Sequence, residues 1–442
     1  MQCDDDVVTT VTGRTWAPGS WRSYECSQMA VYEDQEELSA VLAKLSKVPP
    51  LVHHAEVDRL VAQLASAARG ESFILQGGDC AERFVDCQGE RLDAQVQLLV
   101  QMGAIVAAAT GKPCVRIARL AGQYGKPRSK PTENVPGFGE IFSFKGDNIN
   151  GYDPKDRKWD PQRLLQGYWH SAATLNYVRA LQMSETFSEE MMAPLDVQFL
   201  SKSPSFASWS SVATAAKAAA AAPGLFTAHE AMQLDLEEAL TREVAGKGFY
   251  NLSAHMVWIG DRTRQLLGGH VEYFRGIRNP IGCKVGPSMG AEELKQLVKI
   301  LNPDNIEGKL VLITRYGNDK VEAMLPPHIK AVQESGIHVV WQADGVHGNT
   351  VTAAANKLKT RAYADVLGEC TKAIAIHKAN GSILAGVHLE MTGQKTVTEC
   401  TGGCINIFEA MLTNNYETYC DPRLNYGQSI EAAFAVSDAL LA

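Results

Sequence analysis

The segment Ile281-Gly282-Cys283-Lys284-Val285-Gly286-Pro287 is a short, almost continuously apolar run that stops at a glycine and a proline. Apolar side chains on both faces are typical of a strand covered on both sides, as in a parallel sheet flanked by helices. One charged side chain, Lys284, interrupts this run near its end. Because a lysine is costly to bury without an anion, we expect the end of this strand to lie in an anion-binding site.

Seven further segments of the same kind lie along the chain, and helical patterns separate many of them. The eight predicted strands are Ser72–Gln76, Pro113–Arg119, Leu225–Ala228, Ala254–Ile259, Ile281–Val285, Leu310–Arg315, His338–Ala343 and Leu384–Glu390. The helical patterns include Ala291–Leu301, Pro327–Ser335 and Tyr363–Asn380. This alternation predicts an α/β fold, a (β/α)8 TIM barrel over residues 71–442 with its active site at the C-terminal strand ends.

Two regions lie outside this alternation. Residues 1–70 contain Trp16, Trp21 and the helical stretch Gln35–Leu45, which predicts an ordered N-terminal extension that packs on the barrel. Residues 126–165 are rich in Gly, Pro, Lys and Asp and predict a long loop after the second strand, of a length that is often functional. The alanine-rich stretch Val212–Ala222 is predicted to be helical.

The composition restricts the class of protein. The chain has 442 residues, of which 45% are hydrophobic, enough to build a large core, and its formal net charge of −8 argues against nucleic acid as the main partner. It has no uninterrupted apolar run of 18 residues, and its acidic start, Met1-Gln2-Cys3-Asp4-Asp5-Asp6, resembles neither a secretory signal nor a transit peptide. Its ten cysteines include no Cys-x-x-Cys pair, which favours reduced thiols. We therefore expect a cytoplasmic protein without a membrane partner.

Four candidate metal ligands each close a strand-like or turn-like segment: Cys80, His347, Glu390 and Asp421. One thiolate, one imidazole and two carboxylates suit a divalent transition metal better than calcium. Cys80, His347 and Asp421 each have an ordinary structural explanation alone, such as a buried thiol or an aspartate in a turn before proline, whereas Glu390 ends an apolar strand and does not fit a solvated surface. Their common position at the ends of segments predicts a metal site.

Cations stand at the ends of other predicted strands: Arg119, Arg262, Lys284 and Arg315. The segment Lys126-Pro127-Arg128-Ser129 can hold a phosphate by charge-assisted hydrogen bonds, although such a segment alone is more often a solvated basic turn. Arg262 and Arg264 could clamp an anion, or could form a salt bridge with Asp261 at the start of a helix. A metal surrounded by cations indicates an enzyme that handles phosphorylated anions.

Several longer motifs resemble those of type II 3-deoxy-D-arabino-heptulosonate 7-phosphate (DAHP) synthases. They are Leu-Gln-Gly-Gly-Asp-Cys-Ala-Glu at 75–82, Arg-Leu-Ala-Gly-Gln-Tyr-Gly-Lys-Pro-Arg-Ser at 119–129, Trp-Ile-Gly-Asp-Arg-Thr-Arg-Gln at 258–265, Lys-Val-Gly-Pro at 284–287, His-Gly-Asn-Thr at 347–350, His-Leu-Glu-Met-Thr-Gly at 388–393 and Cys-Asp-Pro-Arg-Leu-Asn at 420–425. The resemblance implies a transferase that condenses phosphoenolpyruvate with erythrose 4-phosphate. This reaction is the first step of the shikimate pathway, which serves aromatic amino acid biosynthesis.

The resemblance also implies roles for individual residues. Cys80, His347, Glu390 and Asp421 match metal ligands, with manganese as the expected metal and cobalt, zinc or iron as alternatives. Arg119, Arg262, Lys284 and Arg315, with Asp261 beside them, match positions that bind phosphoenolpyruvate. Lys126, Arg128 and Ser129 match the segment that meets the sugar phosphate, and Lys359-Thr360-Arg361 resembles a second basic segment near it. Catalysis is expected of Cys80, Lys284, Arg315 and His347, with Lys284 as the candidate proton donor, in a homo-oligomer of two or four chains.

Some features that the resemblance suggests concern regulation or depart from the family pattern. Cys420 could pair with Cys80 on oxidation and eject the metal. The turn Ala343-Asp344-Gly345-Val346 stands where the family has Cys-Asp-Pro-Met, and a glycine in place of the proline is expected to loosen the turn that aims His347. Residues 184–222 match the family poorly in a region tied to aromatic feedback. Two alternatives stay open: a divergent paralogue in secondary metabolism that uses a different aldehyde, and a catalytically silent regulatory homologue.

Overall fold

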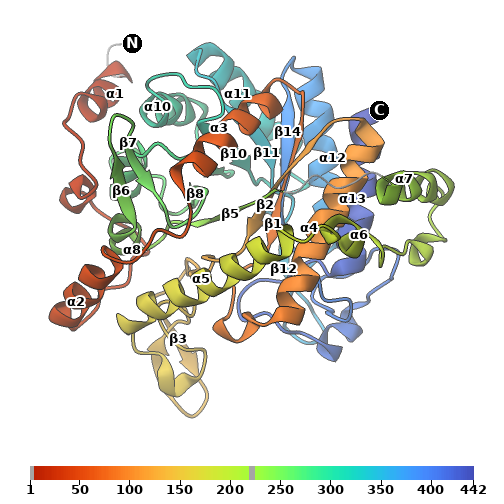
Figure 1. Cartoon of the computed structure of the whole chain (residues 1–442), viewed down its shortest axis with the longest axis horizontal. Coiled ribbons are helices and arrows are strands. Elements are labelled where there is room, and N and C mark those ends of the chain that lie inside the picture. Colours follow the sequence, from red (N-terminus) through yellow and green to blue (C-terminus); the bar gives the residue numbers. More distant parts are fainter. Residues whose placement is uncertain (1–3, 219–223) are drawn as a thin grey trace.

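The computed structural model describes residues 4–218 and 224–442, and a closed barrel of eight parallel strands lies at its centre (Figure 1). In barrel order the strands are β1 (Phe73–Gly78), β2 (Cys114–Arg119), β5 (Leu225–Glu230), β8 (Met256–Ile259), β9 (Ile281–Val285), β10 (Leu310–Thr314), β11 (Val340–Ala343) and β14 (Leu384–Glu390). Strand β14 pairs with β1 and closes the barrel, with Gln76 opposite His388 and Gly78 opposite Glu390. The predicted (β/α)8 barrel and all eight of its predicted strands are confirmed.

Helices cover the outside of the barrel, and the N-terminal extension is itself largely helical. In the described residues they are α1 (Asp4–Thr12), α2 (Gln35–Leu45), α3 (His54–Ala68), α4 (Gly89–Thr110), α5 (Gln162–Gln182), α6 (Phe187–Met192), α7 (Phe206–Ala218), α8 (Leu234–Ala239), α9 (Gly269–Phe274), α10 (Ala291–Leu301), α11 (Val321–Ser335), α12 (Tyr363–Ala379) and α13 (Tyr426–Leu441). The prediction that a helix begins at Pro327 was wrong, because α11 begins at Val321 and contains Pro326 and Pro327. Burial of Val321 and Leu325 offsets the hydrogen bonds that these prolines remove. The predicted helix at 212–222 is present up to Ala218, and its last four residues lie outside the described residues.

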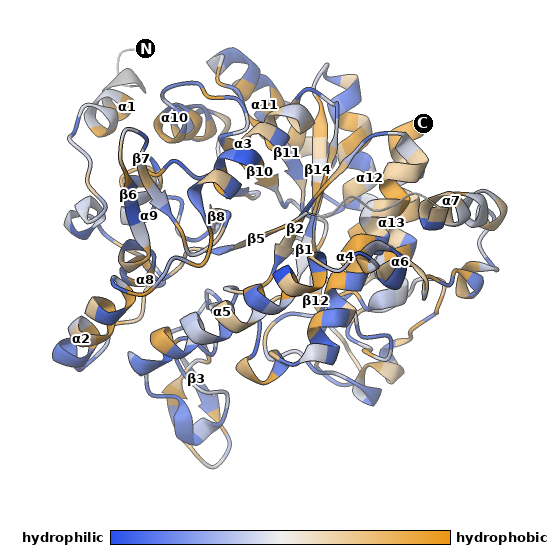
Figure 2. Ribbon diagram, in the orientation of Figure 1, coloured by the Kyte–Doolittle hydropathy of each residue, from blue (hydrophilic) through white to orange (hydrophobic). Residues whose placement is uncertain are grey.

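Helix α4 is a core helix with an unusually apolar sequence. Among the described helices it is the one long and apolar enough to cross a membrane, a property that the search for uninterrupted apolar runs overlooked. Most of that apolar window, 67%, is buried inside the protein. Its buried face, which includes Leu98, Leu99 and Ile105, packs against α13, α7 and strand β2 (Figure 2). Packing within this protein therefore accounts for its composition.

The two ends of the barrel are built differently. At the N-terminal end, Leu60 and Leu64 of α3 pack against the first inward-facing side chains of the strands, among them Ile74, Val115 and Val311. The C-terminal end is open, and two antiparallel hairpins follow barrel strands there: β3–β4 (Thr132–Val135, Gly139–Phe142) after β2 and β12–β13 (Thr350–Thr352, Lys359–Arg361) after β11. A third hairpin, β6–β7 (Thr241–Val244, Gly248–Asn251), precedes β8 and bonds α3 through Lys247 and Tyr250. The predicted loop at 126–165 thus contains a hairpin and the start of α5, which its polar sequence did not reveal.

The N-terminal extension packs on the side of the barrel that carries α8 and α9. The indole of Trp16 donates to the backbone oxygen of Glu272 at 2.9 Å, and that of Trp21 donates to Glu238 at 2.8 Å. Arg22 forms ion pairs with Asp235 and Glu238, both at 2.9 Å. These contacts tie the extension to the segments that follow β5 and β8.

Candidate metal and phosphate site

A cavity of about 910 Å³ opens where the barrel strands end. It brings together most of the predicted site residues, which come from seven separate parts of the chain. Its walls include Lys126, Arg128, Ser129, Asp261, Arg262, Lys284, Arg315, His347, Lys359 and Asp421. The remaining three, Cys80, Arg119 and Glu390, are at most 1% exposed and lie beneath the wall. Cys80 contacts Asp421 of the wall, Glu390 contacts Lys126 of the wall, and Arg119 contacts Glu390.

The predicted metal ligands converge at one side of this cavity. The ligand atoms of Cys80, Glu390 and Asp421 all lie within 4.8 Å of one another. The fourth, His347, stands beside this group, with its Nε2 2.9 Å from Oε1 of Glu390. The other oxygen of Glu390, Oε2, is buried and forms an ion pair with Nη1 of Arg361. This mixed sulfur, nitrogen and oxygen set fits a divalent transition metal.

The ammonium group of Lys126 lies among these ligands. The family resemblance had implied a position at the sugar phosphate instead. Its Nζ is 3.0 Å from Glu390, 3.1 Å from Asp421 and 3.5 Å from Nε2 of His347. Burial alone would lower the pKa of Lys126, but Cys80, Glu390 and Asp421 outweigh it and hold that pKa well above its usual value. The point where the ligands meet thus strongly favours a cation.

The carboxylate of Glu390 forms ion pairs with three cations. Nη2 of Arg119 and Nζ of Lys126 each approach Oε1 at 3.0 Å, and Nη1 of Arg361 approaches Oε2 at 2.8 Å. Burial would raise the pKa of Glu390, but His347, Lys126 and Arg361 hold it well below its usual value. Glu390 is therefore ionised, as a metal ligand must be.

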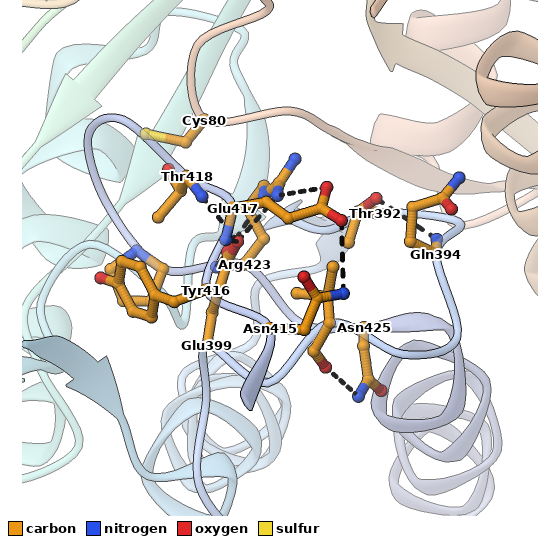
Figure 3. A network of polar contacts seen from close by, with 12 residues as sticks. Cys80, Thr392, Gln394, Glu399, Asn415, Tyr416, Glu417, Thr418, Arg423 and Asn425 are labelled. Atoms are coloured by element: carbon orange, nitrogen blue, oxygen red, sulfur yellow. Dashed lines mark hydrogen bonds and ion pairs between the residues drawn. The ribbon is translucent and has the colours of Figure 1, made fainter. Parts of the chain in front are cut away.

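Asp421 was the weakest ligand candidate in the sequence, and a buried salt bridge explains its placement. Figure 3 shows Glu399, Glu417 and Thr418 gathered around Arg423. Arg423 pairs with Glu399 at 2.7 Å and with Asp79, the neighbour of Cys80, at 2.6 Å. This bridge ties the segment that carries Asp421 to the end of β1, and the amide of Asp421 donates to the sulfur of Cys80 at 3.3 Å.

The thiols of Cys80 and Cys420 lie side by side beneath the cavity and are both unpaired. Burial, and then a hydrogen bond with Cys420, raise the pKa of Cys80 well above its usual value, while the same hydrogen bond lowers that of Cys420. The redox disulfide between them stays a prediction.

Asp344 was noticed in the sequence only as part of a divergent turn, yet it links two predicted site residues. Its Oδ2 accepts from Nδ1 of His347 at 2.7 Å and pairs with the ammonium of Lys284. Burial lowers the pKa of Lys284 to about 8, against the opposing effect of Asp344. Asp344 therefore fixes the ring of His347 with Nε2 directed at the metal ligands.

Hydrogen bonds hold the turn that carries Asp344, and the expectation that Gly345 loosens it relative to a proline stays a prediction. Oδ1 of Asp344 accepts from the amides of Val346 at 3.0 Å and His347 at 3.1 Å. The side chain of Asn349 donates to the backbone oxygen of Gly345 at 2.7 Å. A Cβ at Gly345 would lie 2.2 Å from the backbone oxygen of Val366, so α12 packs against this position and leaves no room for a side chain.

The cations across the cavity divide into two kinds. Arg264 is buried and bonds Asp261 at 2.9 Å and Glu293 at 2.7 Å, so the salt-bridge interpretation applies to it. Arg262 is exposed at the wall, where it donates to the hydroxyl of Ser129 at 3.2 Å. Arg315 contacts Asp261 at 2.8 Å and the backbone oxygen of His347 at 2.8 Å. Arg262 and Arg315 are thus both placed to meet an anion.

The sequence missed further polar groups of the site. Glu230 lines the cavity at the end of β5, and its Oε1 is buried without a partner among the described residues. The predicted strand stopped at Ala228, two residues short, so Glu230 was not recognised as a strand-end residue. His388 contacts Nη1 of Arg119 at 2.8 Å through its Nε2. The one signal in the sequence for a role of His388 in the site is its position two residues before Glu390 in the same strand.

Known proteins match almost the whole chain. Residues 16–437 match the class-II DAHP synthetase family. A protein of Neurospora crassa is 42% identical over an alignment of 465 positions, gaps included, that covers 97% of this chain and 95% of the relative. A protein of Streptomyces coelicolor is 42% identical over 438 residues, covering 96% and 97%. Both are named phospho-2-dehydro-3-deoxyheptonate aldolase. With this match over nearly its full length, the chain belongs to the class-II DAHP synthetase family.

Proposed function

We propose that the protein condenses phosphoenolpyruvate with erythrose 4-phosphate to give DAHP and phosphate. The observation that carries this proposal is the single cavity in which a metal-binding donor set faces a group of cations. Such a cavity can bind an aldehyde oxygen at one side and phosphorylated anions at the other. The family membership and the names of both relatives support the same reaction.

Phosphoenolpyruvate is the substrate that the cations around Asp261 suit best. Lys284 and Arg315 come from the neighbouring strand ends β9 and β10, and Arg262 follows β8. The planar forks of the two arginines match carboxylate and phosphate oxygens, and the lysine adds a point charge. Arg119, in contrast, is buried against Glu390 and His388, so it acts on bound substrate from beneath the wall.

The metal site would receive the aldehyde. A divalent metal, with manganese expected, would be held by Cys80, His347, Glu390 and Asp421 and would supply Lewis-acid polarisation of the aldehyde carbonyl. The methylene carbon of phosphoenolpyruvate forms a bond to the aldehyde carbon, water adds to the neighbouring carbon, and its C–O bond to phosphate breaks. Phosphate leaves with the bridging oxygen.

Two residues are placed to move protons in these steps. Lys284, whose pKa is lowered to about 8, is held by Asp344 and can give a proton to the aldehyde oxygen as it becomes a hydroxyl group. The carboxylate of Glu230 lines the cavity and can accept a proton from the attacking water. The cations stabilise the negative charge that develops on the departing phosphate.

The direct test is turnover by the purified protein. Phosphate release should require phosphoenolpyruvate, erythrose 4-phosphate and a divalent metal, should stop on chelation, and should recover when manganese is added. Lys284→Met should lower the rate by about 100-fold or more, while Lys295→Met on α10 should not.

A panel of other aldehydes tests the divergent paralogue, since turnover with another aldehyde alone would decide for it. Absence of turnover with every aldehyde, despite bound metal, would sink the proposal and leave the silent homologue.

Location and assembly are part of the same proposal. We expect a cytoplasmic enzyme that forms a homodimer or homotetramer and does not depend on membranes or nucleic acid. Light scattering of the purified protein measures the assembly, and a monomer at micromolar concentration would contradict it.

A further inference from the structure

One residue of the N-terminal extension reaches the cavity segment. The side-chain oxygen of Gln28 accepts a hydrogen bond from the backbone amide of Arg128 at 2.9 Å. The backbone oxygen of Gln28 accepts from the ammonium of Lys145 at 2.8 Å. Lys126 and Lys145 are themselves joined, because the amide of Lys126 donates to the backbone oxygen of Lys145 at 2.8 Å. Gln28 therefore lies at the closed base of the segment that carries the β3–β4 hairpin.

The backbone of Gln28 is held in a conformation that glutamine disfavours. Its φ is +69°, in the left-handed region that side chains other than glycine rarely adopt. Both flanks of the bend are fastened to the barrel side: the amide of Gly269 donates to the backbone oxygen of Glu25 at 2.9 Å, and the amide of Ala30 donates to the side chain of Gln233 at 3.0 Å. Such strain persists where surrounding structure imposes it, which suggests a role for the residue held there.

The bond from Gln28 acts on the part of the cavity wall that carries Arg128 and Ser129. Pro127 has no amide hydrogen to donate, so the amide of Arg128 is the nearest backbone donor that can fix the turn. The guanidinium of Arg128 is 3.6 Å from Glu133, a weak contact, and Ser129 accepts from Arg262 across the cavity at 3.2 Å. The position of Arg128 and Ser129 at the cavity thus depends strongly on the oxygen of Gln28.

We propose that Gln28 is a positioning residue that sets the backbone of Arg128 and thereby the place where Arg128 and Ser129 meet the phosphate of the aldehyde substrate. This inference rests on the proposed function, in which erythrose 4-phosphate occupies that side of the cavity. It gives the N-terminal extension a part in substrate affinity. Gln28 does not touch substrate and acts through the amide of Arg128.

The test separates substrate affinity from rate and from folding. Gln28→Gly removes the side chain and the φ strain together, and Gln28→Glu keeps an acceptor oxygen. Gln35→Ala removes a glutamine of the same extension whose side chain donates to the backbone oxygen of Tyr32. Loss of one hydrogen bond should raise KM for erythrose 4-phosphate roughly two- to tenfold in Gln28→Gly. The kcat, the KM for phosphoenolpyruvate, the metal content and Tm should stay near wild type. Gln28→Glu should restore most of the affinity, and Gln35→Ala should change none of these quantities.

Each other outcome overturns the inference. An unchanged KM for erythrose 4-phosphate in Gln28→Gly would remove the role of Gln28 while leaving the proposed function intact. Loss of kcat, both affinities and Tm together would show a merely structural tie. If the wild-type protein itself fails to turn over, the proposed function fails separately, and binding of erythrose 4-phosphate by calorimetry decides the inference. Equal dissociation constants for wild type and Gln28→Gly would then refute it.

Discussion

The two ends of the barrel bury lysine in opposite ways. At the open end, Lys126 lies against Glu390 and Asp421, and Lys284 lies against Asp344. At the closed end, the ammonium of Lys309 is buried against the backbone oxygens of Ile277 and Asn279, and the described residues give it no carboxylate within ion-pair distance. Charge is therefore compensated by charge where ligands bind, and by backbone carbonyls where the barrel is closed.

This difference teaches how the fold separates chemistry from stability. Charged side chains from separate strands meet at the open end. Burying these charges costs desolvation free energy, which a bound metal or anion would offset. At the closed end, α3 completes an apolar core in which burial itself stabilises the fold. Substitutions at the two ends should thus have effects of different kinds.

The largest effect is expected from Glu390→Gln at the open end. The amide removes the negative charge that Arg119, Lys126 and Arg361 face, and leaves three buried cations around a neutral group. Phosphate release should fall by about 1000-fold or more, and the metal content after dialysis should fall with it. Glu189→Gln, at an exposed position on α6, is the control and should change neither quantity. Metal and rate both retained in Glu390→Gln would count against the site.

At the closed end, Leu64→Ala should weaken the fold without affecting the chemistry. Leu64 is fully buried in the cluster that plugs the barrel. The free energy of unfolding should fall by about 2–5 kcal/mol, measured by urea denaturation. Both KM values should stay unchanged in the protein that remains folded. A selective change in KM would show that the two ends are coupled.

Asp344→Asn tests the link between Lys284 and His347. The carboxylate of Asp344 accepts from Nδ1 of His347 and also neutralises Lys284. An uncharged amide can accept from His347 but cannot neutralise Lys284. Metal affinity should fall by about 10- to 100-fold, measured by calorimetry on the chelator-treated protein, with saturating metal restoring part of the rate. Wild-type metal affinity in this variant would mean that the turn alone aims His347.

Lys309→Met should change how stability depends on pH. Burial lowers the pKa of Lys309 from 10.5 to about 7, so between these values the unfolded chain binds a proton that the folded protein does not. The wild-type free energy of unfolding should therefore rise with pH across this window, by up to about 1.4 kcal/mol per pH unit from this group. Lys309→Met should lack that contribution, so its advantage over wild type should be largest near pH 7 and shrink towards pH 10. Parallel urea curves for the two proteins at every pH would refute this account.

The barrel could be predicted from sequence because its strands are buried on both faces. The runs at Ile281–Val285 and Leu384–Glu390 carry this signal over their whole length, and the structure gives them the same bounds. Strand ends were less certain, because a polar residue at a strand end lies outside the apolar run, and Glu230 was missed for that reason. Polar hairpins such as β3–β4 carry no apolar alternation and were not predicted.

The candidate site was predictable in its residue types but not in its contacts. Cys80, His347 and Glu390 follow strand ends, so a closed barrel had to bring them together. The position of Lys126 among the ligands and the bridge from Asp344 to Lys284 depend on distances between residues far apart in the chain. Neither spacing nor periodicity encodes such contacts.

The central claim is that the open end of the barrel uses one metal-bearing site for the condensation. The measurement that tests it most directly is phosphate release from phosphoenolpyruvate and erythrose 4-phosphate while manganese is titrated into chelator-treated protein, with bound metal measured in parallel. The claim predicts one ion bound per chain and a rate that rises in proportion to the fraction of chains with metal. Full turnover by the metal-free protein, or saturation with metal without any phosphate release, would contradict it.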